Sequence, residues 1–331
     1  MIISRTPVRI SLGGGGTDLA SYYSKFGGFL IAGAINKYVH ISCTKRFENQ
    51  IRLSYSKTEI VDNISQIKHP IFREALKLVG IESQIELVSI SDVPASCGLG
   101  TSSTFTVSLL NALYTYKREF INKNNLAEAA CYIEIDKLSE PIGKQDQYAT
   151  TFGGITAFTF NKDGSVVIEP LKMKEEDIEE FNMNTMLFFT GVQRSASDIL
   201  KKQDDSTKKG LANTVDRLHR IKDMGYESKQ ALESGNIDKF GELLHEHWLT
   251  KKGINSKITL GLVDEAYEKA RSLGALGGKL IGAGGGGFLM IYSSSNRKKI
   301  VSVLKKMGLR YMRYRFDMDG SIIIANYNYP F

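Results

Sequence analysis

The stretch Pro94-Ala95-Ser96-Cys97-Gly98-Leu99-Gly100-Thr101-Ser102-Ser103-Thr104 decides how the chain is organised. An alternating segment, residues 85–90, predicts a β-strand before it, and an apolar run, residues 105–113, predicts a buried helix after it. Such a strand, glycine loop and helix start can bind an anion through free backbone N–H groups and the positive end of the helix dipole. Because Ser and Thr are also the usual N-terminal caps, an ordinary capped helix explains this stretch equally well.

Composition indicates a globular protein with two lobes. The chain has 331 residues, of which 42% are hydrophobic and 24% charged, and it is long for a single domain. A shift to charged sequence near residue 172 predicts the lobe boundary, giving lobes 1–172 and 173–331. The net charge of +7 is concentrated in residues 297–306 and 310–315, which we interpret as a solvated helix face rather than a nucleic-acid site.

Other sequence features favour a cytoplasmic protein without nucleic-acid or membrane partners. The cysteines, Cys43, Cys97 and Cys131, form no CxxC pair, so neither a zinc site nor a disulfide framework is predicted. No run approaches the ~20 apolar residues of a membrane span, and the N-terminus lacks a signal-peptide pattern. Small molecules are the expected partners, and the oligomeric state cannot be predicted.

The order of the predicted elements favours an α+β fold. Strands are expected at 1–12, 29–32, 38–43, 51–55, 85–90, 155–160, 166–168, 185–190 and 289–292, and two more after residue 307. Helices are expected at 70–79, 105–113, 126–138, 195–204, 209–223, 226–234, 236–250, 259–273 and 296–307, and another begins near residue 144. Residues 204–209 are expected to form a polar connection.

Two further glycine clusters flank the central one. Four consecutive glycines, Gly13–Gly16, stand between a predicted strand and a helix-like segment, which suggests close approach of the main chain to another group. Gly282–Gly287 matches G-x-G-x-x-G, but no acidic residue follows at ~20 positions, where a dinucleotide fold places its ribose partner. A P-loop is absent because Gly278-Lys279 is followed by Leu280.

Candidate residues for phosphoryl transfer lie near these clusters. The reaction requires a bound donor, neutralised charge and an aligned acceptor hydroxyl. Ser102 and Glu134 supply hard oxygen atoms of the kind that a metal on the donor phosphates prefers. Asp146, just after the break at 140–143, is a candidate to accept or orient the acceptor's proton, and helix capping is its alternative role.

Three segments, residues 7–18, 94–103 and 279–287, resemble the ordered motifs of the GHMP kinases, named for galactokinase, homoserine kinase, mevalonate kinase and phosphomevalonate kinase. The resemblance covers essentially the whole chain. Residues 7–19, 143–148 and 193–196 are most similar to members that phosphorylate the anomeric hydroxyl of a heptose 7-phosphate. The resemblance implies an N-terminal lobe like ribosomal protein S5 domain 2, a ferredoxin-like C-terminal lobe with extra helices, and an active site between them.

The resemblance also implies roles for individual residues. Asp146 would abstract or orient the acceptor's proton, and Arg9 would keep Asp146 ionised and stabilise the transferred charge. Ser102 and Glu134 would hold Mg²⁺. The residues implied to bind the ATP phosphates are Pro94, Cys97, Gly98, Leu99, Gly100, Thr101, Ser102 and Ser103. The residues implied to bind the sugar are Gly14, Gly15, Gly16, Thr17, Asp18, Lys144, Arg194, Gly284 and Gly285.

One segment departs from the family pattern. Where many relatives have Gly-Glu-His-Thr-Asp, this chain has Gly14-Gly15-Gly16-Thr17-Asp18, which leaves space for a bulkier, phosphorylated sugar. A second phosphate on that sugar needs cations, and we consider Lys45, Arg46, Lys144 and Arg194 as candidates.

The expected activity is therefore that of an ATP- and Mg²⁺-dependent sugar 1-kinase. Its product would supply nucleotide-activated heptose for surface polysaccharide. A kinase of another sugar such as fucose or galactose is the alternative within the enzyme class. A non-catalytic sugar or nucleotide sensor with this fold and an RNA-binding module are the alternatives from other classes.

Overall fold

The computed structural model describes residues 1–192, 197–254 and 261–327. The strands of a first sheet are β1 (Ile2–Gly13), β2 (Gly28–Lys45), β3 (Ile51–Ser54), β4 (Thr58–Val61), β5 (Ile85–Ser91), β6 (Ile155–Phe160), β7 (Val166–Pro170) and β12 (Ile322–Asn326). The strands of a second sheet are β8 (Thr185–Phe189), β9 (Gly277–Leu280), β10 (Phe288–Tyr292) and β11 (Arg310–Met312).

Helices accompany both sheets. Those in the first half of the chain are α1 (Ala20–Phe26), a 3₁₀ turn η1 (Ile64–Gln66), α2 (Pro70–Val79), α3 (Thr101–Lys117), α4 (Lys123–Cys131), a π-helical segment η2 (Tyr132–Lys137) and α5 (Gln145–Phe152). Those in the second half are α6 (Glu175–Asn184), α7 (Ser197–Lys208), α8 (Ala212–Glu233), α9 (Ile237–Lys252), α10 (Gly261–Ser272) and α11 (Arg297–Lys306).

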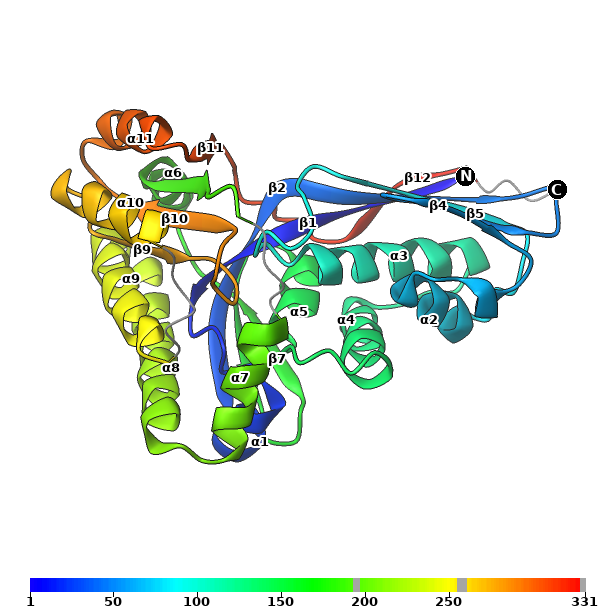
Figure 1. Ribbon diagram of the computed structural model, residues 1–331, viewed down its shortest axis with the longest axis horizontal. Helices are drawn as coiled ribbons and strands as arrows, with labels where there is room; N and C mark the ends of the chain where they lie inside the picture. Colours follow the sequence, from blue (N-terminus) through cyan, green and yellow to red (C-terminus); the bar gives the residue numbers. More distant parts are fainter. Residues whose placement is uncertain (193–196, 255–260, 328–331) are drawn as a thin grey trace.

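The two sheets form the centres of two lobes, which confirms the predicted α+β class (Figure 1). The first sheet has the strand order β12-β1-β2-β5-β3-β4, with β6 paired to β2 and β7 to β6. The second sheet has the order β11-β8-β10-β9. Helix α3 packs on β1 and β2, and its apolar residues form one core with α2 and the strands β3 and β5.

Strand β2 is one long strand where the sequence predicts two. Its pairing with β1 shifts register between Pro7 and Val8, so that Pro7 lies opposite Tyr38 while Val8 lies opposite Ile35. The extra residues make the pairing irregular and interrupt the alternation of side chains without ending the strand, as a β-bulge does. The apparent gap between the two predicted strands therefore corresponds to this irregular pairing.

One predicted break between helices is absent, and another lies further along the chain than predicted. Helix α8 continues through Gly225, where a Cβ atom would lie 3.1 Å from a ring carbon of Phe29 and 3.2 Å from Cα of Gly14, so glycine allows the helix to pack closely on these residues. Helix α7 continues to Lys208, through most of the predicted polar connection. It buries Gln203 and Thr207 on one face, so its polar sequence belongs to a packed helix.

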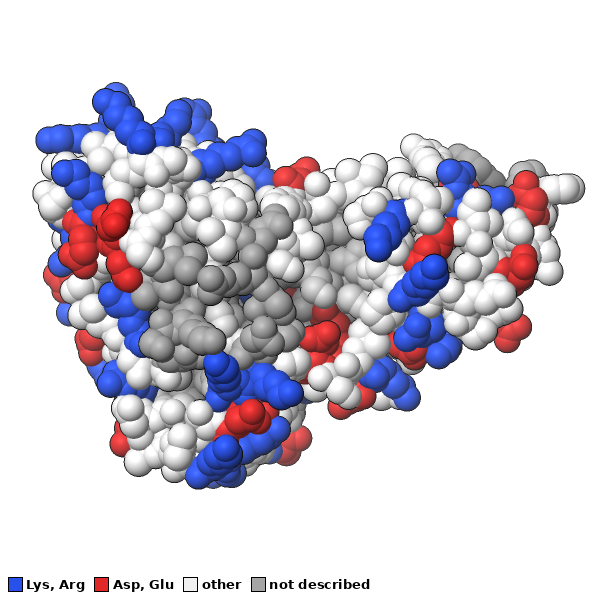
Figure 2. Space-filling view, in the orientation of Figure 1, with Lys and Arg blue, Asp and Glu red and all other residues white. Residues whose placement is uncertain are grey.

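After β11 the chain returns to the first sheet, where β12 pairs with β1 and Ile2 lies opposite Asn326. The lobe boundary near residue 172 remains a prediction. Figure 2 shows basic side chains gathered over α11, and Lys298, Lys299, Lys305 and Lys306 are exposed there, as expected for a solvated face. In the part of the chain that the structure describes, every helix is too short or too polar to cross a membrane.

Candidate active site

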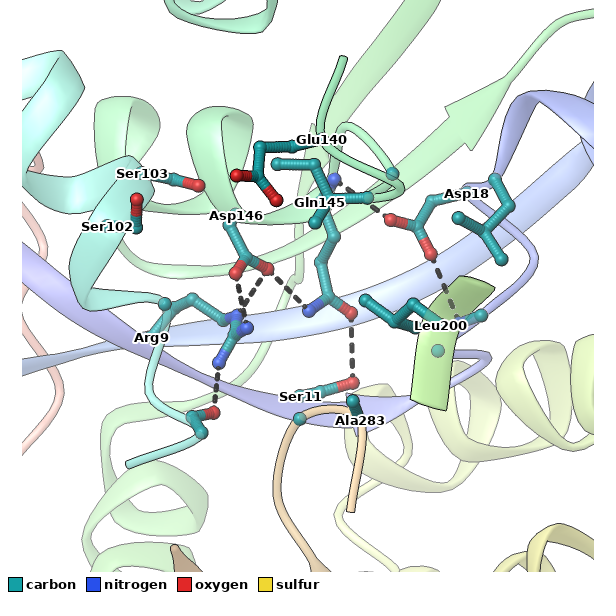
Figure 3. Close-up of a pocket in the computed structure, with 18 of the residues that line it drawn as sticks. Arg9, Ser11, Asp18, Ser102, Ser103, Glu140, Gln145, Asp146, Leu200 and Ala283 are labelled. Carbon is teal, nitrogen blue, oxygen red and sulfur yellow. Dashed lines mark hydrogen bonds and ion pairs between the residues drawn. The ribbon is translucent and has the colours of Figure 1, made fainter. Parts of the chain in front are cut away.

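A cavity of about 280 Å³ lies where β1, the start of α3, the start of α5 and the glycine loops meet (Figure 3). Its described lining includes residues from all three glycine clusters, which are far apart in the sequence. These residues are Gly15, Gly16, Ser96, Gly98, Gly100, Thr101, Ser102, Ser103, Gly282 and Ala283. The remaining lining residues used below are Arg9, Ser11, Asp18, Glu134, Gln145, Asp146, Leu200, Gln203 and Lys251.

Helix α3 begins at this cavity without a cap from any described side chain. Its N-cap residue is Gly100, in the left-handed conformation with φ of +74°. A Cβ atom at Gly100 would lie 3.0 Å from Oδ2 of Asp146, so glycine is needed both for this conformation and for this close approach. The first-turn amides of α3 are therefore available to an anion, and the alternative of an ordinary capped helix is wrong.

Arg9 and Asp146 form a two-bond ion pair beside this helix start (Figure 3). Arg9 Nε donates to Asp146 Oδ1 at 2.7 Å, and Arg9 Nη2 donates to Oδ2 at 2.5 Å. Arg9 Nη1 donates to the carbonyl oxygen of Gly98 at 2.7 Å. Asp146 lies in the first turn of α5, whose N-cap residue is Lys144, so its carboxylate is used in this pair and not as a cap.

Gln145 connects this pair to Asp18. Its side chain donates to Asp146 Oδ1 at 3.1 Å and accepts from Ser11 Oγ at 3.0 Å, while its backbone N–H donates to Asp18 Oδ2 at 3.1 Å. Burial, together with the nearby charge of Asp146, raises the pKa of Asp18. Two carboxylates are thus held at fixed positions along one side of the cavity.

Ser102 and Glu134 meet on the other side of Asp146. Ser102 Oγ donates to Glu134 Oε1 at 2.9 Å, and Gln147 Nε2 donates to Oε2 at 2.7 Å. Glu134 is 1% exposed, and burial raises its pKa to about 7. It lies in η2, a π-helical segment where the sequence predicts a continuous α-helix, and such segments occur often at functional sites.

The third glycine cluster packs directly on the central loop. A Cβ atom at Gly282 would lie 2.8 Å from the carbonyl oxygen of Gly98, so these two backbones touch. Gly282 and Ala283 line the cavity, whereas Gly284 and Gly285 are not among the described residues that do.

Several residues predicted to bind ATP or the sugar do not line the cavity but hold the backbone next to it in place. The Thr17 hydroxyl donates to the carbonyl oxygens of Gly14 and Phe29, and the Leu99 carbonyl accepts from the backbone of Arg9. In the described part of the chain, Gly14, Thr17, Pro94, Cys97 and Leu99 are outside the lining.

The candidate cations for a second phosphate are scattered. Lys144 lines a neighbouring cavity, where it donates to Glu128 at 2.8 Å and to the carbonyl of Gly164 at 2.9 Å. Lys45 lies at the end of β2, and Arg46 next to it pairs with Glu48 and Glu86, so neither reaches the cavities described here. Arg194 lies outside the described residues.

Sequence reasoning missed Lys251, Gln145, Gln203 and Leu200 as lining residues. Lys251 Nζ donates to the carbonyl oxygen of Gly282 at 2.6 Å, and Gln203 Nε2 donates to that of Gly16 at 3.2 Å. Both belong to helices outside the glycine motifs, and only their burial distinguishes them from solvated polar residues. The position of Gln145 next to Asp146 was the one available signal.

Comparison with known proteins identifies the family of the chain. The GHMP kinases N terminal domain matches residues 53–154, and the GHMP kinases C terminal domain matches residues 228–308. The chain belongs to the GHMP kinases. As a GHMP kinase it is a phosphotransferase with ATP as the donor and a hydroxyl group as the acceptor.

Individual GHMP kinases are similar over nearly the full length. D-glycero-alpha-D-manno-heptose 7-phosphate kinase of Campylobacter jejuni is 29% identical, over 96% of this chain and 97% of that protein. The galactokinase of Pyrococcus furiosus is 26% identical, over 91% of each. The crystal structure of a D-glycero-D-manno-heptose 1-phosphate kinase from Bacteroides thetaiotaomicron superposes with a TM-score of 0.82 at 26% identity, covering 99% of this chain and all of that one.

Proposed function

We propose that this GHMP kinase transfers the γ-phosphoryl group of ATP to the anomeric hydroxyl of D-glycero-α-D-manno-heptose 7-phosphate, giving the 1,7-bisphosphate. The observation that carries the proposal is the Arg9–Asp146 pair, held between an uncapped helix start and a glycine-lined acceptor space. The near full-length similarity to a heptose 7-phosphate kinase supports the choice of sugar.

Asp146 orients the acceptor hydroxyl and takes its proton as the new O–P bond forms. Arg9 keeps the carboxylate in place through two hydrogen bonds, and its positive charge stabilises the negative charge of the phosphoryl group in transfer. The ATP phosphates bind the free amides at the start of α3, next to Gly98 and Gly100. This arrangement aligns donor and acceptor, which is the main contribution of a protein to phosphoryl transfer.

The acceptor sugar binds between Asp146 and the first glycine cluster. Asp18 accepts hydrogen bonds from sugar hydroxyls there, and Gly15 and Gly16 leave room that larger side chains would fill. Of the four candidate cations considered above, Lys144 is the described one that we assign to the second phosphate, because its cavity shares Asp18 and Gly143 with the first one. The phosphate would compete with Glu128 for its ammonium group.

Ser102 and Glu134 would hold Mg²⁺, and the residues present fit such an ion. Glu134 is a buried carboxylate whose raised pKa reflects burial, with no cation among the described groups that act on it. A bound Mg²⁺ would neutralise charge on the ATP phosphates. Because no cluster of three or more potential metal ligands occurs among the described residues, phosphate and water oxygens would complete the coordination, as is usual for Mg²⁺.

A coupled ADP-release assay against a panel of sugars tests the substrate. We expect kcat/KM for heptose 7-phosphate to exceed that for unphosphorylated heptose, fucose and galactose by at least about 10²-fold, because a lost charge-assisted contact leaves polar groups unpaired. A higher kcat/KM for fucose or galactose would contradict the proposed substrate.

A further inference from the structure

A group of buried basic side chains, one of which lines the cavity, is left unused by the roles above. His247 and Lys251 are one turn apart on α9, and Lys279 lies on β9, which packs against α9. Their exposed fractions are 2%, 9% and 1%, respectively.

These side chains lack the acidic partners that buried basic groups normally have. Neither ring nitrogen of His247 has a hydrogen-bond partner in the described structure. Across residues 1–192, 197–254 and 261–327, neither Lys251 nor Lys279 forms an ion pair; the acidic group whose charge acts on Lys251 is Asp18. This part of the site is therefore short of negative charge.

The position of Lys251 shows where the missing anion belongs. Its Nζ donates a hydrogen bond to the carbonyl oxygen of Gly282, whose backbone touches that of Gly98. The carbonyl oxygen of Gly98 in turn accepts a hydrogen bond from Arg9. Lys251 and Arg9 are thus anchored on two glycine loops in contact with each other, and their charges repel. An anion in the cavity between them would turn this repulsion into two attractions.

We propose that Lys251 is a catalytic residue whose ammonium group contacts the phosphoryl group while it passes from ATP to the acceptor. The inference rests on the proposed role of Asp146. As the bond from the acceptor oxygen to phosphorus forms and the bond from phosphorus to the ADP oxygen breaks, the hydroxyl proton goes to Asp146. Lys251 keeps its proton and donates a hydrogen bond to a non-bridging phosphoryl oxygen.

This role of Lys251 predicts a specific pH dependence of kcat/KM. The titratable groups facing Lys251 are Arg9 and Asp18 in the cavity, Lys279 on β9 and His247 on its own helix, and burial lowers the pKa of both Lys279 and His247 well below their ordinary values. Burial and the charge of Arg9 lower the pKa of Lys251 to about 8. The free enzyme therefore loses this positive charge as the pH rises above about 8, and kcat/KM should fall with it.

The test compares Lys251→Met and Lys251→Arg with Lys252→Met, a neighbouring lysine that pairs with Asp264 instead. The assay measures kcat and KM with heptose 7-phosphate and with any unphosphorylated sugar that the wild type accepts. Lys251→Met should lower kcat by about 10²–10³-fold with every acceptor, as expected for one lost transition-state donor, with little change in KM. Lys251→Arg should keep more activity and lose the fall above pH 8, and Lys252→Met should resemble the wild type.

Three results would overturn the proposal: an unchanged kcat in Lys251→Met, an increase in KM confined to phosphorylated acceptors, or a fall above pH 8 that persists in Lys251→Arg. The second result would make Lys251 a ligand of the acceptor's own phosphate and leave the proposed substrate intact. A wild type that prefers another sugar would contradict the proposed substrate, but the same comparison would then be made on that sugar. Circular dichroism verifies folding, and Lys251→Arg decides the question if Lys251→Met does not fold.

Discussion

Replacing Asp146 with asparagine tests the centre of the proposed mechanism, because it keeps the shape of the side chain and removes its charge. Both carboxylate oxygens accept hydrogen bonds from Arg9, at 2.7 and 2.5 Å. An amide places an NH₂ group against one of these donors, so one of the two bonds is lost and the other no longer joins opposite charges.

The magnitude follows from the two functions of Asp146. A hydrogen bond to a charged group contributes about 1.5–3 kcal/mol, and Arg9, which is 4% exposed, has little water to replace it. We therefore expect the free energy of unfolding to decrease by about 1.5–3 kcal/mol. Loss of the proton acceptor should lower kcat by about 10²–10⁴-fold, or about 3–5 kcal/mol in the activation barrier.

Coupled ADP release gives kcat, calorimetric titration gives the ATP dissociation constant, and denaturant unfolding gives stability. The dissociation constant should change little, because the ATP site proposed above lies at the start of α3 and not at Asp146. Asp264→Asn is the matched control, since Asp264 pairs with Lys252 outside the cavity. A folded Asp146→Asn enzyme with kcat within about tenfold of the wild type would refute the assignment, because such a loss is below that of general base catalysis.

Three further substitutions test other parts of the site. Glu134→Gln should raise the Mg²⁺ concentration needed for half-maximal activity. The pKa of the wild-type carboxyl is raised from 4.5 to about 7, so the wild type loses stability as the pH rises through this interval. Without metal, the variant should therefore be more stable than the wild type at pH 8, by up to about 3 kcal/mol, and not at pH 5. Gly100→Ala should cost about 1–2 kcal/mol of stability and, by displacing Asp146, lower kcat by about 10²-fold, whereas Gly80→Ala, at φ of +69° in open space, should cost stability alone. Lys144→Met should raise KM for heptose 7-phosphate by about tenfold and leave KM for unphosphorylated heptose unchanged.

Each of these has a result that would count against it. Thermal unfolding in EDTA at pH 5 and pH 8 checks Glu134. An equal change in stability at both pH values would show that the buried charge of Glu134 is not its cause. Equal kcat in the two glycine variants would mean that Gly100 does not protect the position of Asp146. A KM that rises equally for both sugars would show that Lys144 does not recognise the second phosphate.

The parts of the site that could be predicted are those where local sequence limits the backbone. Gly98 and Gly100 mark the start of α3, and the resemblance to the GHMP kinases led to Arg9 and Asp146, which the structure brings into contact. The α+β class followed from the order of strand and helix patterns.

What could not be predicted depends on contacts between distant segments. Lys251 lies on a helix whose polar residues are spaced like those of a solvated face, and only the packing of α9 against β9 buries it. The π-helical segment containing Glu134 has no local sequence signal that separates it from an α-helix. Likewise, Gly225 predicts a helix break unless Gly14 and Phe29 are known to lie against it.

The pairing of β12 with β1 determines when the protein can finish folding during synthesis. Ile2 in β1 is paired with Asn326 in β12, more than 300 residues further along the sequence. Until β12 (Ile322–Asn326) has been synthesised, one side of β1 has unpaired backbone groups, and such an edge can recruit other chains. Ribosomes carrying incomplete chains should therefore depend on chaperones, and removal of residues beyond 320 should cause aggregation even though the cavity residues described above are all retained.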